Sequence, residues 1–126
     1  MQNYNSKVKI QIKQRTFQYA LEIIKFIDHL DKHDLSIRVI AQQLLRSATS
    51  IGANVTEAQA SSSKKEFTNF LNYSLKSANE SKFWLALIRD SGKAKRESAD
   101  KLLSETKQLA NILASSILTL KGKRSK

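Results

Sequence analysis

The sequence has no cysteine, no proline and only three glycines among its 126 residues. Without cysteine the chain cannot form a disulfide, bind a metal through thiolates or use a thiol nucleophile. Without proline, and with so little glycine, it has few of the residues that end helices and shape tight turns. Because 40% of the residues are nevertheless hydrophobic, we predict long helices and an all-α fold. The length suits a single domain over residues 1–126.

Long apolar runs and histidines are scarce as well. The longest apolar run, Phe83–Ile88, is too short to cross a bilayer, and the polar N-terminus lacks a secretory signal, so we expect a cytoplasmic protein without a membrane partner. His29 and His33 lie near a charged helix end, without the glutamate that a zinc protease places between its histidines. No glycine-rich phosphate loop is present. We therefore predict no metal, no cofactor and no catalytic residues: the protein is not expected to be an enzyme.

Charge is plentiful but unevenly distributed. The chain has 22 Lys+Arg against 11 Asp+Glu, a formal net charge of +11. Two terminal segments, 1–15 and 121–126, contain eight of these basic residues and no acid. They are Lys7, Lys9, Lys13, Arg15, Lys121, Lys123, Arg124 and Lys126. The rest of the chain has a net charge of only +3, so the basic character is a property of the ends.

Four segments show the 3.6-residue period of a helix with one apolar face. We predict helices at about 14–31, 36–58, 64–90 and 96–120, with basic tails at 1–13 and 121–126. Asp34 or Ser36 is expected to cap the second helix, and Ser63 with Glu66 forms a capping box for the third. The residues expected to form the core face of the first helix are Phe17, Ala20, Leu21, Ile24, Ile27 and Leu30.

Short connections make consecutive helices antiparallel, so the simplest assembly is an up-down-up-down four-helix bundle. In such a bundle the start of the first helix, the connection between the second and third helices, and the end of the fourth lie at one end. Both basic tails would gather there with Lys64 and Lys65. Lysine and arginine bind nucleic-acid phosphates with little sequence preference, which makes RNA or DNA the leading candidate partner.

A second face is predicted on the two middle helices. Four polar residues of the second helix and four residues of the third fall within about 80° and 60°, respectively, away from the core stripes. They are Arg46, Ser50, Asn54 and Glu57, followed by Tyr73, Glu80, Trp84 and Leu87. Either Trp84 is buried in a tilted bundle and the polar side is solvated, or these residues form a subunit interface. The second interpretation predicts self-association.

The segment from Leu45 to Ala58 resembles the family of 23S rRNA intervening-sequence proteins, which are four-helix bundles. This family is similar to the accessory variability determinant protein of diversity-generating retroelements. The elements that carry the resemblance are Arg46-Ser47, Ser50-Ile51, Asn54-Val55-Thr56-Glu57-Ala58, Ser63-Lys64-Lys65-Glu66-Phe67, Phe70-Leu71 and Ser77-Ala78-Asn79-Glu80. They extend a match over roughly Phe17 to Leu120. Thr56 and Ala58 depart from the alanine and glycine that the family often has.

The resemblance implies a ring-shaped homopentamer and an origin in an insertion within a ribosomal RNA gene, without making the protein a component of the ribosome. In the retroelement relatives a basic ring binds nucleic acid and a reverse transcriptase. The resemblance thus implies nucleic acid and a nucleic-acid-processing protein as partners. The alternative is a protein-interaction scaffold with no nucleic-acid role, because the biochemical role of the intervening-sequence branch is undefined.

Overall fold

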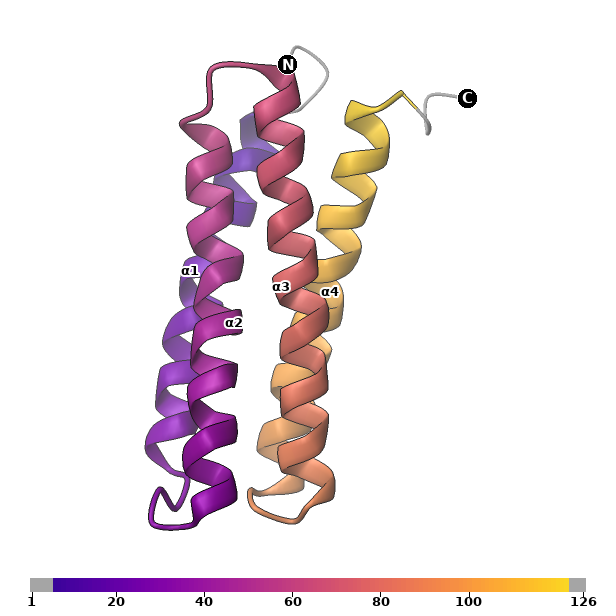
Figure 1. Cartoon of the computed structure of the whole chain (residues 1–126). Coiled ribbons are helices and arrows are strands. Elements are labelled where there is room, and N and C mark those ends of the chain that lie inside the picture. Colours follow the sequence, from indigo (N-terminus) through magenta and orange to yellow (C-terminus); the bar gives the residue numbers. More distant parts are fainter. Residues whose placement is uncertain (1–5, 123–126) are drawn as a thin grey trace.

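The computed structural model describes residues 6–122, which fold into four long helices (Figure 1). Helix α1 spans Ser6–Asp28, α2 spans Leu35–Gln59, α3 spans Lys64–Asp90 and α4 spans Arg96–Leu120. Consecutive helices run antiparallel, and α4 returns beside α1 to close the bundle. No strand occurs within residues 6–122. The all-α, four-helix prediction is confirmed.

The predicted N-terminal caps of α2 and α3 are confirmed, although the reciprocal bond of the capping box, to the Glu66 carboxylate, comes from the Ser62 amide. The Asp34 carboxylate accepts a hydrogen bond from the Ile37 amide at 3.2 Å and caps α2. The Ser63 hydroxyl accepts one from the Glu66 amide at 3.1 Å and caps α3. Gly92, just after α3, has a φ of 74°, a left-handed conformation that glycine adopts without strain.

Helix α1 begins at Ser6 rather than at about residue 14, so the predicted N-terminal basic tail is wrong for residues 6–13. No proline or glycine interrupts the chain there, and the early turns are held by the rest of the bundle. Ile12 is only 2% exposed, and the Gln59 side chain of α2 donates a hydrogen bond to the Lys9 carbonyl at 2.8 Å. Lys7, Lys9 and Lys13 therefore lie on helix α1, which packs against the bundle, and not on a separate tail.

The core face predicted for the first helix, α1, is partly wrong. Ile27 and Leu30 are buried as expected, whereas Phe17, Leu21 and Ile24 are 67%, 39% and 42% exposed. The buried face of α1 is instead Ile12, Thr16, Tyr19, Ile23, Phe26, Ile27 and Leu30. Apolar residues occur on several sides of α1, so periodicity alone fits more than one stripe.

A few polar groups link the helices inside the core. The Tyr19 hydroxyl lies 2.6 Å from the Thr106 hydroxyl, connecting α1 to α4, and the Ser47 and Ser81 hydroxyls lie 2.9 Å apart between α2 and α3. Within residues 6–122 every buried side-chain N or O atom has a hydrogen-bond partner. These bonds fix the register of the helices against one another.

Helices α1 and α2 approach each other closely at Gly52. A Cβ on Gly52 would lie 3.2 Å from the Thr16 hydroxyl, so the glycine makes this close approach possible.

None of the helices within residues 6–122 combines the length and apolar character that a bilayer-spanning segment needs.

Candidate nucleic-acid interface and subunit surface

The bundle brings most of the predicted basic residues to one end. Figure 1 shows the start of α1, the connection between α2 and α3, and the end of α4 all at the top of the molecule. The residues at this end are Lys7 and Lys9 in the first turns of α1, Lys64 and Lys65 in the first turn of α3, and Lys121 directly after α4. Lys13 follows one turn farther along α1. Lys123, Arg124 and Lys126 lie outside the described residues.

The lysines at this end are open to a ligand. Lys13, Lys64, Lys65 and Lys121 are exposed, and none of them forms an ion pair within the part of the chain that the structure describes. Lys9 is half-buried, with its ammonium 5.1 Å from the centre of the Phe67 ring on α3. The described part of the basic end is therefore a set of lysines held by three helix termini.

Arg15, which was also predicted to be part of the basic end, is not one of its exposed cations. Its guanidinium forms a bidentate ion pair with Glu105 of α4, at 2.7 and 3.2 Å, and also donates to the Gln108 side chain at 3.2 Å. This pairing offsets its charge and fixes the side chain against α4. Nothing in the sequence indicates the pairing, because Glu105 lies 90 residues away along the chain.

The opposite end of the bundle has cations too, and acidic side chains pair with several of them. Lys93 pairs with Asp34 at 2.6 Å, and Arg89 pairs with Asp90 at 2.8 Å and with Asp100 at 2.9 Å. The hydrogen bond from Lys93 lowers the pKa of Asp34 to about 2, and the bond from Arg89 lowers the pKa of Asp90. Ion pairs thus offset part of the positive charge at this end, whereas Lys95 and Lys101 form none within residues 6–122.

The two ends of the bundle differ in their balance of basic and acidic residues. Among the described residues, 6–13, 57–66 and 114–122 at the basic end contain six basic and two acidic residues. Residues 28–38 and 89–101 at the other end contain seven basic and six acidic residues. The described part of the molecule therefore has one cationic pole and one nearly balanced pole.

The predicted subunit surface on α2 and α3 is partly an internal contact. Glu80 of α3 forms an ion pair with Arg46 of α2 and accepts a hydrogen bond from the Trp84 indole at 2.9 Å. Trp84 is half-buried and packs against the core cluster. These three side chains therefore connect α2 with α3 within one subunit, and only their outer surfaces are available to another.

The other predicted surface residues remain accessible. Ser50 and Asn54 donate hydrogen bonds to carbonyls one turn earlier in α2, at 2.7 and 2.9 Å, and Glu57 is exposed. Tyr73 is 50% exposed and Leu87 is 39% exposed. Phe83, which the sequence reasoning missed, is 59% exposed and stacks edge-on with Trp84. We call the residues Val39, Tyr73, Phe83, Trp84 and Leu87 the α2/α3 face; Val39 is 51% exposed.

The structure also reveals an exposed apolar stripe on α1, three of whose four residues were predicted to lie in the core. Ile10, Phe17, Leu21 and Ile24 are 57%, 67%, 39% and 42% exposed. At ~100° per residue they fall within about 60° of one another, so they form one continuous stripe. A monomeric protein rarely exposes so many large apolar side chains together, and such patches mark interaction sites. We call these four residues the α1 stripe.

The two histidines form no metal site with their surroundings. His29 Nδ1 lies 2.8 Å from the Lys25 carbonyl oxygen, and the His33 amide donates to the Asp31 carboxylate at 3.0 Å. Within residues 6–122 no three His, Asp or Glu side chains gather where they could hold an ion.

Four antiparallel helices with a cationic pole and two exposed apolar surfaces define a small all-α bundle. Residues 8–115 match the model of the 23S rRNA-intervening sequence protein family, and the chain belongs to that family. The resemblance drawn from the sequence is thereby confirmed. The biochemical function of this family is unknown.

A solved structure supports the same assignment. The chain is similar to a protein of unknown function from the S23 ribosomal protein family of Bacteroides thetaiotaomicron VPI-5482, with 33% identity and a TM-score of 0.78. The similarity covers 84% of this chain and 97% of that one. No curated protein matches the chain significantly.

Proposed function

We propose that this protein is a non-enzymatic, homo-oligomeric nucleic-acid-binding protein that holds RNA or DNA by its backbone phosphates at the basic end. The observation that carries the proposal is the charge contrast between the two poles. At the balanced pole seven basic residues are offset by six acidic ones, and Arg89, Lys93 and Arg96 pair with carboxylates. By contrast, Lys13, Lys64, Lys65 and Lys121 have no such partner among residues 6–122. When such lysines bind phosphates, the nucleic acid releases its condensed counterions. The affinity is therefore sensitive to salt and shows little sequence preference.

Assembly into a ring would strengthen this binding. A ring needs two different, complementary surfaces on each subunit, because each contact is head-to-tail. The α1 stripe and the α2/α3 face meet that need, since α1 and α3 lie diagonally across the bundle and expose these surfaces on different sides. We propose that the stripe of one copy packs on the α2/α3 face of the next. The ring size, five, comes from the family resemblance.

Cyclic symmetry places the same pole of every subunit on the same side. The described residues of each copy contribute an excess of four positive charges at its basic end. A five-membered ring would therefore present about +20 on one side, enough to turn weak individual phosphate contacts into strong combined binding.

Salt-dependent binding tests the nucleic-acid proposal. The full chain would be titrated with duplex DNA and with a structured RNA at several salt concentrations. The basic-end variant would carry Lys64→Gln and Lys65→Gln, and the matched control would carry Lys76→Gln and Lys107→Gln, which removes the same charge elsewhere. We expect the basic-end variant to reduce the salt slope by about 0.9 for each duplex phosphate that it no longer neutralises, and the control to reduce it far less.

An absence of binding by the unmodified chain at low salt would refute the proposal. It would favour the alternative, in which the protein is a scaffold that docks a partner protein through its outer faces and the lysines only aid solubility. Equal effects of the two variants would also contradict a role for the basic end.

Native mass tests the assembly. We expect the unmodified chain to have a particle mass several times that of one subunit. Phe17→Glu in the α1 stripe and Leu87→Glu in the α2/α3 face should each reduce it to the subunit mass without loss of helicity. Gln11→Glu, on an exposed side of α1 away from the stripe, is the matched control and should leave the mass unchanged. A monomeric unmodified chain would refute the ring.

A further inference from the structure

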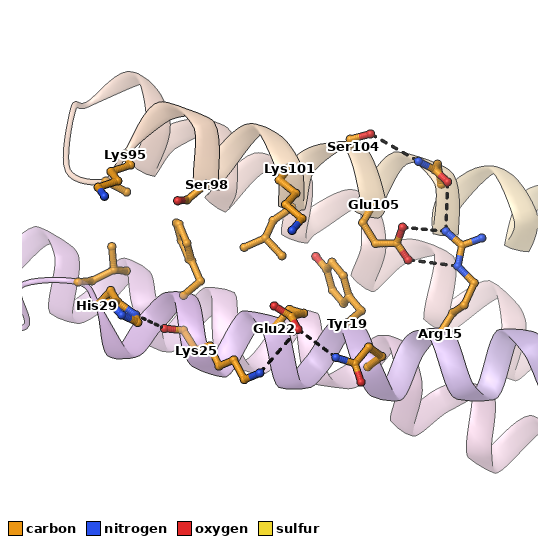
Figure 2. Close-up of a pocket in the computed structure, with 16 residues that line it drawn as sticks. Arg15, Tyr19, Glu22, Lys25, His29, Lys95, Ser98, Lys101, Ser104 and Glu105 are labelled. Atoms are coloured by element: carbon orange, nitrogen blue, oxygen red, sulfur yellow. Dashed lines mark hydrogen bonds and ion pairs between the residues drawn. The ribbon is translucent and has the colours of Figure 1, made fainter.

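A long groove runs between α1 and α4, and none of the surfaces described above includes it (Figure 2). Its volume is about 1000 Å³. It extends from Arg15 and Gln108 at one end to Leu30 and Ala94 at the other. Seen around the axis of α1, the groove opens about 120° away from the α1 stripe, so the two features are separate surfaces.

The groove is open because α4 presents small side chains along it. Near the basic end the two helices are joined by the Arg15–Glu105 ion pair and by the Tyr19–Thr106 hydrogen bond. Farther along, α4 and the turn before it contribute Ser98 and Ala94, which are too short to reach across to α1. Figure 2 shows Ser98 opposite the α1 residues of this stretch.

The floor of the groove is apolar. Phe26, Leu30 and Leu102 line it and are only 8%, 7% and 9% exposed, because they also belong to the bundle core. The Tyr19 hydroxyl is already bonded to Thr106 and offers little to a ligand. An occupant must therefore bring an apolar surface to this floor.

The acidic side chains on the α1 side of the groove and at its Arg15 end already have partners. Glu105 is paired with Arg15, while Glu22 accepts a hydrogen bond from Gln18 at 2.9 Å and lies 3.9 Å from the Lys25 ammonium. These carboxylates disfavour a phosphate chain in the groove.

The α4 side has the opposite character. Lys95 and Lys101 line it, and within residues 6–122 neither forms an ion pair. The unpaired charge of the groove is therefore positive and confined to one rim. This polarity calls for an occupant with acidic residues along one side.

The dimensions indicate the form of that occupant. From Arg15 to Leu30 the groove follows α1 for about 22 Å at ~1.5 Å per residue. A volume of about 1000 Å³ over that length gives a mean cross-section of about 45 Å², roughly half that of an α-helix with its side chains, whose diameter is ~10–12 Å. A helix of about 15 residues lying half-sunk in the groove fits this space.

We propose that the α1/α4 groove docks an acidic amphipathic helix of a partner protein. Apolar residues of that helix, at i, i+3, i+4 and i+7, pack on Phe26, Leu30 and Leu102, and its acidic side faces Lys95 and Lys101. The partner helix completes the side of the bundle that α1 and α4 leave open. Helix α1 of a second copy is a poor occupant, because residues 6–21 of that helix contain four basic residues and no acid.

Fluorescence anisotropy with the full chain tests this inference. The probe is a labelled synthetic 16-residue peptide with leucines on one helical face and glutamates along one flank. The comparison peptides are a scrambled version and one with lysine in place of glutamate. We expect the acidic amphipathic peptide to bind at least tenfold more tightly than either.

Variants locate the binding. Ser98→Trp fills the groove and should weaken binding at least tenfold, and the pair Lys95→Glu and Lys101→Glu should do the same while improving binding of the lysine peptide. Lys107→Glu, on α4 but outside the groove, should change affinity less than twofold. Circular dichroism checks that each variant stays helical; if Ser98→Trp does not fold, the lysine reversal decides.

Three results would overturn the inference. The first is no binding of the acidic peptide, and the second is equal binding of the scrambled peptide. The third is competition by an RNA oligonucleotide that Ser98→Trp abolishes, which would make the groove a nucleic-acid site instead.

Discussion

The hydrogen bond between Tyr19 and Thr106 offers a direct test of how α1 is held to α4. Tyr19 is 2% exposed, and its hydroxyl lies 2.6 Å from the Thr106 hydroxyl. Thr106 uses its own hydrogen to donate to the Leu102 carbonyl at 2.6 Å, so the tyrosine is the donor. Burial raises the pKa of Tyr19 to about 12, although the bond to Thr106 opposes this, so the phenol remains protonated across the neutral range.

Tyr19→Phe removes the donor and keeps the ring. We expect it to lower the free energy of unfolding by about 1 kcal/mol, the typical net contribution of such a bond. Thr106→Val leaves the buried phenol without its acceptor and should lower the free energy by about 1–2 kcal/mol. The double variant removes both polar groups, so its loss should fall short of the sum of the two single losses by about 1 kcal/mol.

The assay is urea unfolding followed by circular dichroism, at one protein concentration for all variants because assembly would add to apparent stability. Tyr73→Phe is the matched control. Tyr73 is 50% exposed, so the loss of its hydroxyl should change stability by less than about 0.5 kcal/mol. Strictly additive losses in the double variant would show that the two hydroxyls do not stabilise each other and would refute this account of the α1–α4 contact.

Three other predictions follow from the helix contacts and caps. Gly52→Leu should destabilise the fold by about 2 kcal/mol or more by forcing α1 away from α2, whereas Ala53→Leu on the exposed side should not; equal unfolding midpoints would contradict the close approach. Ser63→Ala should lower the free energy of unfolding by about 1 kcal/mol through loss of the α3 cap, measured by urea unfolding. Because Lys93 lowers the pKa of Asp34 from 3.8 to about 2, this carboxylate stabilises the fold above pH 3.8 and the contribution disappears as the pH falls toward 2. Asp34→Asn should therefore reduce the drop in urea midpoint between pH 4 and 2, and an unchanged drop would contradict the role of the pair.

Most of the fold could be predicted because α2, α3 and α4 each have a long run of apolar residues at the helical period that is buried in the core. On α4 the apolar residues recur on one side and polar residues fill the others, so only one orientation buries them. The caps at Asp34 and Ser63 act through local hydrogen bonds, which residue type and spacing indicate directly. Local rules of this kind need no knowledge of distant parts of the chain.

The site was harder to predict because its electrostatics depend on contacts between distant segments. Arg15 looks equivalent to Lys13 in the sequence, but the bundle places it against Glu105 and removes it from the basic end. Glu80 and Trp84 look like surface residues on a helical wheel, yet α2 supplies Arg46 beside them. In each case the partner lies far along the chain, and only the packed bundle brings the two together.

Helix α1 shows how an error in the predicted core face can point to function. A helix in a monomeric bundle needs one apolar stripe, whereas α1 has a buried one and an exposed one. The four side chains of the exposed stripe are roughly half accessible, and burying them against a second copy would contribute on the order of 1 kcal/mol each.

The arrangement of the copies in such a contact determines whether their basic ends can bind one nucleic acid together. If two α1 stripes paired antiparallel, the basic ends would point in opposite directions and act separately. If the stripe packs on the α2/α3 face of the next copy around a closed ring, all basic ends face one side. The symmetry of the native particle therefore decides whether one ring can hold a single stretch of nucleic acid with all its subunits at once.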